Sequence, residues 1–110
     1  MEQVDIYRAF YDYQEVFSKI GKIKGEVRYF DDSENLWQII INEYQHELKI
    51  AKGLLIKMEC NSTVSIKYLN ESSILIDVLN NDCIIFLDPC LNEKIANKII
   101  KCTIIFSGIV

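Results

Sequence analysis

The stretch Ser33–Gly53, SENLWQIIINEYQHELKIAKG, carries the strongest folding signal in the sequence. Apolar side chains recur along it at helical spacing, and polar side chains fill the opposite side. Asp32 or Ser33 can cap the free backbone N–H groups at its start, and Gly53 can end it. The pattern predicts one amphipathic helix. Ile39 and Ile50 fall outside the main apolar stripe, which indicates that the helix is contacted from a second side.

Four short segments with strand character follow this helix, over 56–60, 64–68, 74–79 and 83–87. The first two alternate apolar and polar side chains, as expected of an antiparallel sheet with one wet face. The last two are apolar on both faces, and Asn80-Asn81 between them favours a hairpin turn. Helices can cover one face of this hairpin. We expect its other face to meet the C-terminal elements, a second subunit or a partner.

The N-terminal part of the chain shows both periodicities in turn. Residues 2–20 repeat apolar side chains at helical spacing, and Gly21 can end that helix. Residues 22–30 then alternate with a period of two, which predicts a strand with its apolar side in the core and its charged side in water. The apolar side holds Ile23, Gly25, Val27 and Tyr29, and the charged side holds Lys22, Lys24, Glu26 and Arg28.

The C-terminal part completes the predicted architecture. Asp88-Pro89 is typical of a helix start, so we expect a third helix near 89–101 and a last strand over 103–110. The whole chain, 1–110, is predicted to be a single α+β domain with the order α-β-α-β-β-β-β-α-β. Its sheet should be antiparallel, with the helices mainly on one face and residues 1–21 forming an N-terminal helix that packs on the sheet.

Composition narrows the classes of function. The 110 residues carry a net charge of −4 and a pI near 4.9, which disfavours a nucleic-acid partner and suits a basic protein partner. The first residues show no export signal, and charges interrupt every apolar run before it could span a membrane. We therefore expect a cytoplasmic protein, no membrane contact, and four reduced cysteines.

The residues that usually carry chemistry are sparse. Glu43 and His46 have the Glu-x-x-His spacing of a metal-binding helix, but His46 is the only histidine and no second pair exists. Cys90 falls at the start of the predicted third helix, where a thiol pKa can be lowered, yet Asp88 acts against this. The four glycines build no phosphate-binding loop. We expect no catalytic site, no metal site and no cofactor.

Two groups of residues could contact a partner. Tyr7 and Tyr11 lie off the apolar stripe of the N-terminal helix, where they could anchor an interface or pack on the sheet. Asp31, Asp32 and Glu34 gather at a strand-to-helix junction, where partner contact and helix capping are alternative explanations.

A third group is basic. Lys22, Lys24 and Arg28 align on one side of the first predicted strand. They could form a small anion-binding strip. The alternative is an outward or edge-strand face on which charges prevent aggregation.

The function that the sequence favours is non-enzymatic protein binding. Small acidic domains of this kind include inhibitors and immunity or antitoxin-type proteins, which neutralise a basic partner. The alternative is a homodimeric small-ligand-binding or hot-dog-like enzymatic domain with its site at the subunit interface. We also expect self-association through the apolar hairpin 74–87 or through the last strand, 103–110.

Overall fold

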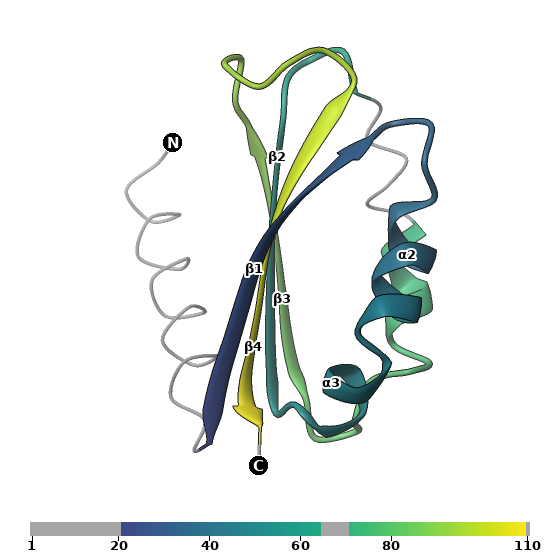
Figure 1. Cartoon of the computed structure of the whole chain (residues 1–110), viewed down its shortest axis with the longest axis vertical. Helices are drawn as coiled ribbons and strands as arrows, with labels where there is room; N and C mark the ends of the chain where they lie inside the picture. The colour runs from purple at the N-terminus through teal and green to yellow at the C-terminus, as the bar shows by residue number, and fades with distance from the viewer. Residues whose placement is uncertain (1–20, 65–70, 110) are drawn as a thin grey trace.

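A four-stranded sheet with helices on one face forms the part of the chain that the computed structural model describes, residues 21–64 and 71–109 (Figure 1). The predicted N-terminal helix, including its packing on the sheet, lies outside these residues. The strands are β1 (Lys22–Asp31), β2 (Gly53–Cys60), β3 (Ile84–Leu91) and β4 (Ile99–Ile109), and the helices are α2 (Leu36–Glu43), α3 (Gln45–Ile50) and the 3-10 helix η1 (Ser72–Leu75).

The sheet is mixed, so the prediction of an antiparallel sheet is wrong in one strand pair. The strand order is β1-β4-β2-β3. β4 pairs antiparallel with both β1 and β2, whereas β2 and β3 run parallel. The α+β class is confirmed, and the four strands place β1 and β3 at the two edges.

The predicted hairpin over 74–87 is absent, and this explains the parallel pair. Residues 72–75 form η1, which lies against α2, and only the second half of the expected hairpin becomes a strand, β3. Leu75 is fully buried while Ile74 and Ile76 are exposed, so the apolar run contributes Leu75 to the core, with Val78 and Leu79 packed partly against it, rather than a strand face. Because the chain crosses over the helical layer before β3, it re-enters the sheet in the same direction as β2.

The predicted third helix is also absent. β3 continues through Pro89 to Leu91, and the next element is β4, which begins at Ile99. Proline lacks a backbone donor, but an edge strand leaves alternate N–H groups unpaired, so Pro89 is tolerated there. The predicted last strand is confirmed and longer than expected. It is a central strand and not an edge.

The predicted helix over 33–53 is divided into α2 and α3. Tyr44 stands between them with φ −115° and ψ 30°, outside helical values. The side chain of Asn35, rather than that of Asp32 or Ser33, accepts the capping hydrogen bond from the Gln38 backbone N–H, at 3.4 Å. Within the described ranges, no helix has the length and apolarity that a bilayer span requires.

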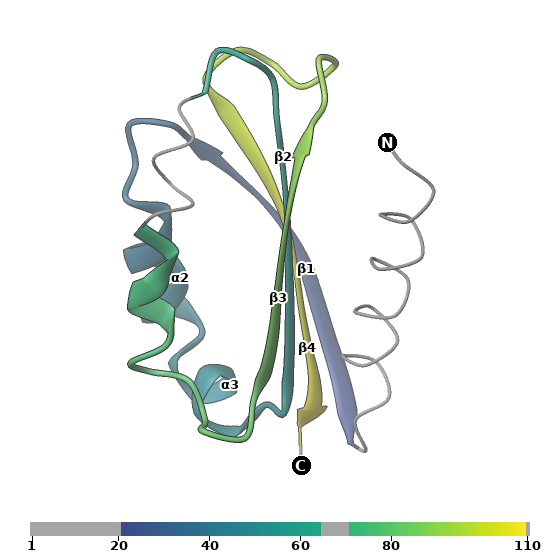
Figure 2. The same cartoon turned by 180° about the vertical axis from the view of Figure 1, so that it is seen from behind.

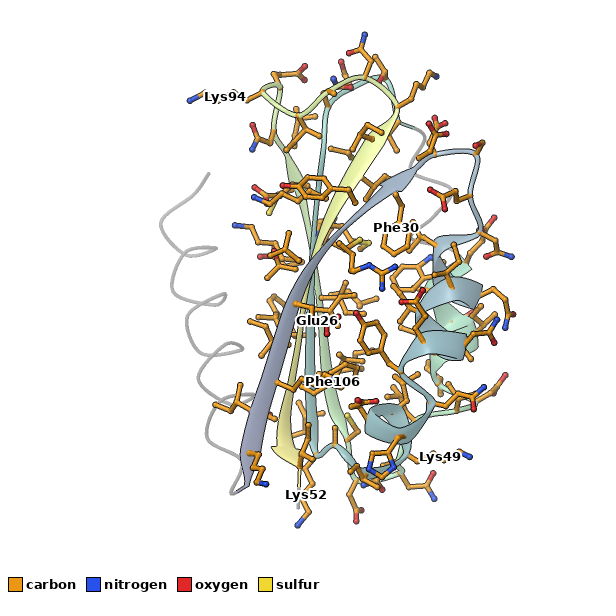
Figure 3. All side chains as sticks on the ribbon, viewed as in Figure 1. Glu26, Phe30, Lys49, Lys52, Lys94 and Phe106 are labelled. Atoms are coloured by element: carbon orange, nitrogen blue, oxygen red, sulfur yellow. The ribbon has the colours of Figure 1, made fainter. Side chains whose placement is uncertain are left out.

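The core lies between the helices and one face of the sheet, which we name the first face. Register places the side chains of paired residues on the same face. Phe30 of β1 lies in the space between the sheet and α2 (Figure 3). Leu36, Trp37, Ile40 and Leu48 cover this face from the helices, and the strands contribute Leu54, Ile56, Met58, Ile100, Cys102, Ile104 and Phe106.

A buried asparagine joins the loops at the end of β2. The side-chain amide of Asn61 donates to the Ile95 carbonyl oxygen and to Asn97 Oδ1, both at 2.8 Å. Its Oδ1 accepts from the Thr63 backbone N–H at 2.9 Å, so every polar atom of this buried side chain is used. The Lys98 backbone, at φ 62°, donates to Thr63 Oγ1. These bonds hold the β2 and β4 ends together.

The central strand should dominate stability. Ile104 in β4 is 1% exposed and Ile76 after η1 is 68% exposed. We expect Ile104→Ala to lower the free energy of unfolding by about 2–5 kcal/mol, because it leaves a cavity between sheet and helices. Ile76→Ala deletes the same atoms from a side chain that is already exposed, so it should lower the free energy of unfolding by less than about 0.5 kcal/mol. Urea unfolding followed by Trp37 fluorescence measures both. Equal losses of unfolding free energy in the two variants would contradict the placement of Ile104 in the core.

Candidate functional site

The edge strand β1 presents its two sides in the opposite way from the prediction. Ile23, Val27 and Tyr29 were expected in the core, yet they are 56%, 51% and 62% exposed. Lys24, Glu26 and Arg28, expected in water, face the helices, as their bonds to α2, α3 and Tyr44 show. We name Ile23, Val27 and Tyr29 the β1 strip. Strand alternation alone would place these three side chains in the core.

The charged side of β1 is held by the helices. Arg28 pairs with Glu43, through Nη1 to Oε2 and through Nη2 to Oε1 at 3.2 Å. Lys24 Nζ donates to Glu47 Oε1 at 2.6 Å, and the Tyr44 hydroxyl donates to the Glu26 carboxylate while accepting from Arg28 at 3.4 Å. The six residues, which we name the β1–helix cluster, are Lys24, Glu26, Arg28, Glu43, Tyr44 and Glu47.

The electrostatics of this cluster favour fixed charges. The hydrogen bond from Arg28 lowers the pKa of Glu43, and the hydrogen bond from Lys24 lowers the pKa of Glu47. Partial burial, followed by the hydrogen bond to Glu26, raises the pKa of Tyr44. Glu43, Glu47 and Tyr44 therefore keep their usual charge states near neutral pH, which suits a clamp between strand and helices better than proton transfer.

The cluster bears directly on the anion-binding prediction. Lys24 and Arg28 lie on one side of β1, but each already holds a carboxylate. Lys22 is separated from them by a register shift between Lys22 and Lys24 and is exposed. The structure thus brings two of the three cations together and places acidic partners between them. Anion binding by these residues stays a prediction.

The acidic junction after β1 is bonded within itself. Asp31 Oδ1 accepts from the backbone N–H and the hydroxyl of Ser33, at 2.9 and 2.7 Å, which lowers the Asp31 pKa. Glu34 Oε1 accepts from the Asp31 backbone N–H at 2.9 Å. Asp32 lies 3.8 Å from Lys98 Nζ. Asp31 and Glu34 remain exposed at the end of the strand that carries the β1 strip. Tyr7 and Tyr11 lie outside the described residues.

The candidate chemistry residues are separated. Cys90 lies in β3, and burial and Asp88 raise its pKa, so the thiol is protonated. Burial also raises the pKa of Cys102, to about 12. His46 is exposed on α3, while Glu43 holds Arg28. Among residues 21–64 and 71–109, no group of three or more His, Cys, Asp or Glu side chains is placed to hold a metal ion.

The face of the sheet opposite the helices, which we name the second face, carries apolar side chains beside charged ones. Figures 1 and 2 place α2, α3 and η1 together on the first face. Alternation and register assign to the second face the β1 strip and side chains from the other three strands. The apolar ones are Ile105 of β4, Leu55 of β2, and Ile84 and Phe86 of β3, and the polar ones include Lys57, Asp88, Thr103 and the ion-paired Lys101 and Glu59.

Comparison with known proteins relates this arrangement to one fold. A tryptophan-to-tyrosine mutant of FtsZ from M. jannaschii matches with a TM-score of 0.69 and 15% identity, over 91% of this chain and 32% of that chain. An empty FtsZ dimer from M. jannaschii matches with a TM-score of 0.67 and 17% identity, over 90% and 30%. This chain therefore spans about a third of the FtsZ length, and at these identities the likeness concerns the fold alone. No family model and no curated protein matches the sequence.

The ion pairs of the β1–helix cluster should make the free energy of unfolding depend on pH in the acid range. Lys24→Gln with Arg28→Gln removes the cations that hold the Glu43 and Glu47 pKa values below 4.5. These carboxylates stabilise the fold above that pH, and the stabilisation is lost as pH falls through their folded pKa values. We expect the double variant to be less stable than the wild type at neutral pH, with a difference that shrinks below pH 4.5.

Urea unfolding across the acid range measures this difference. Lys22→Gln is the matched control, since it removes a cation from the same strand outside the cluster, and it should leave the pH dependence unchanged. A stability difference that is the same at all pH values would mean that the pairs do not couple to folding.

Proposed function

We propose that this chain is a non-enzymatic protein-binding domain that contacts its partner through the β1 strip. The observation that carries the proposal is the inversion of β1, which leaves Ile23, Val27 and Tyr29 more than half exposed on one side of an edge strand. Single exposed apolar residues are ordinary on protein surfaces. Three on the same side of one strand form a patch, and a tyrosine within it is typical of interface anchors.

The neighbouring polar groups support binding rather than catalysis. In the β1–helix cluster, carboxylates, cations and the Tyr44 hydroxyl bond to one another and not toward open space. A catalytic group needs a pKa near the operating pH and access to a substrate. The shifts of Glu43, Glu47 and Tyr44 instead move those pKa values away from neutrality.

The chemistry of the partner follows from what borders the strip. Asp31 ends β1 on the same side as Tyr29, and the exposed Glu34 follows in the next turn. The Ser33 hydrogen bonds keep the Asp31 pKa low, so the charge beside the strip persists. With a net charge of −4, the chain suits a partner that joins an apolar patch to basic side chains. An inhibitor or immunity or antitoxin-type protein that neutralises a basic protein has this requirement.

Self-association is the second candidate, and the fold restricts its routes. β4, which contains 103–109, is paired on both sides and offers no free edge. β3, from the 74–87 segment, is an edge strand with partly buried apolar side chains, and an added strand could pair with it. A homodimer with a small-ligand or hot-dog-like enzymatic site at its interface remains the alternative proposal.

Charge introduced into the strip should abolish partner binding. Val27→Asp with Tyr29→Asp adds two carboxylates to an apolar contact without touching the core. Full-length tagged chain is expressed in the host cells, and a protein retained by the wild type is purified and titrated by calorimetry. We expect the double variant to weaken binding at least about 100-fold, since two interface anchors of this type are worth about 3 kcal/mol or more.

Ile76→Asp is the control, because Ile76 is equally exposed but follows η1, away from the sheet. It should bind as the wild type does. Equal affinity of the strip variant and the wild type for the purified partner would contradict the proposal. Sedimentation of the wild type alone separates the alternatives: a concentration-dependent dimer lost in the strip variant supports self-association instead.

A further inference from the structure

The two edges of the sheet differ in how open they are. β1 and β3 are the edge strands. All residues of β1 except Arg28 and Phe30 are exposed, whereas β3 exposes only Pro89 and Leu91. Pro89 also lacks the backbone donor that pairing with a further strand uses. Within residues 21–64 and 71–109, no strand pairs with the outer side of β1. β1 is therefore the edge at which a further strand adds most easily.

The outer side of β1 carries a row of backbone hydrogen-bonding groups. Successive residues of a strand point their N–H and C=O groups to opposite sides in the plane of the sheet, and in β1 one of the two sets pairs with β4. The other set points away from the sheet, along a strand of ten residues without proline. The register shift in its pairing, between Lys22 and Lys24, lies at its start. From Lys24 to Asp31 the edge has room for about seven added residues.

The charges of β1 do not protect this edge in the usual way. Edge strands commonly carry charges that an incoming strand would leave buried and unpaired. Here Lys24 holds the Glu47 carboxylate, and Arg28 holds that of Glu43. An incoming strand therefore meets ion pairs rather than unpaired cations. Because the cluster also contains Glu26, it holds three carboxylates against two cations and keeps one net negative charge.

We propose that the partner adds an extended segment to β1 as a further strand, with basic and apolar residues in alternation. The inference rests on the proposed partner contact at the β1 strip and names the form of the partner there. Side chains of neighbouring strands that share a face lie side by side. One set of partner side chains lies beside the β1 strip and is therefore apolar. The other set lies beside the β1–helix cluster, where the Glu43 side chain is 47% exposed, and is therefore basic.

A second copy of this chain meets the requirement less well. Its β1 also alternates apolar and charged side chains, but Lys24 and Arg28 of that copy are bonded to its own helices. Edge-to-edge pairing of two copies would also bring together two clusters that each have a net negative charge. A partner strand with free lysine or arginine side chains instead neutralises the exposed Glu43. A further cation at the end of that strand reaches Asp31, which is exposed at the end of β1.

A peptide titration of the full-length chain tests the inference. The probe is a fluorescein-labelled heptapeptide in which lysine alternates with valine, beginning and ending with lysine, and fluorescence anisotropy measures its affinity. A peptide of the same composition with all lysines before all valines is the control, since it keeps the charge and loses the alternation. We expect the alternating peptide to bind at least about tenfold more tightly. Equal affinity of the two peptides, or no binding of either, would overturn the inference.

Backbone methylation separates strand pairing from side-chain docking. In an added strand the N–H groups of one set, the valines or the lysines, point to β1, and those of the other set point to water. N-methylation of the set that points to β1 should weaken binding about 100-fold, because it removes about three hydrogen bonds that contribute a factor of about five each. N-methylation of the other set should change the affinity less than about twofold. Equal effects of the two sets would contradict strand addition.

Amide hydrogen exchange locates the peptide on the protein. Alternate amides of β1 should exchange more slowly when the alternating peptide binds, and the amides of β3 should not change. Val27→Asp with Tyr29→Asp should remove both binding and protection, whereas Ile76→Asp should keep them. Protection of β3 instead of β1 would overturn the inference. So would β1 amides that are already protected without peptide in a sample that sediments as a dimer, since a second copy then occupies the edge.

The two proposals fail in different ways. If the strip variant loses the purified partner while both methylated peptides bind equally, the contact at the β1 strip stands and only strand addition is wrong. If the strip variant keeps the purified partner, the partner contact itself is wrong, whatever the peptides show.

Discussion

The fold depends on two central strands that bury side chains on both faces of the sheet. β4 and β2 lie between β1 and β3, and their alternating side chains bury Ile104 and Ile56 on one face and Leu55 on the other. Apolar side chains on both faces of a sheet need a covering layer on each face to exclude water. The helices cover the first face of the sheet. The proposed partner contact concerns the second face, part of which is exposed.

The packing of the edge strand β1 explains why part of the second face is exposed. Phe30 fixes which side of β1 faces the helices, because it packs in the core beside Ile100. With period two, this choice sends Arg28 and Lys24 to the helices and Val27 and Tyr29 away from them. The long basic side chains are accommodated because Glu43 and Glu47 line the helices opposite them. Phe30 and the two ion pairs thus turn the charged side of β1 toward the helices and its apolar side away from them, the opposite of what alternation alone suggests.

Local patterns predicted β1, β2, the start of β3 and the existence of β4, because strand alternation and turn residues are local properties. The direction of β3 was not predictable, since it depends on the crossover after Cys60 and not on the hydropathy of β3. Asp88-Pro89 misled for a similar reason: the same dipeptide suits a helix start and an edge strand. Alternation placed Val27 and Tyr29 in the core, and neither was predicted to contact a partner. Their exposure follows from the packing of Phe30 against the helices, which the local pattern does not show.

Solvent access to the second face tests the central claim most directly. A soluble gadolinium chelate broadens the methyl resonances that it can approach, and assigned methyl spectra of the full chain report each one separately. We predict strong broadening for the Val27 and Ile23 methyl groups and weak broadening for those of Leu55, on the same face, and of Ile104, on the other. Protection of Val27 comparable with that of Ile104 would place β1 with its apolar side in the core and contradict the account.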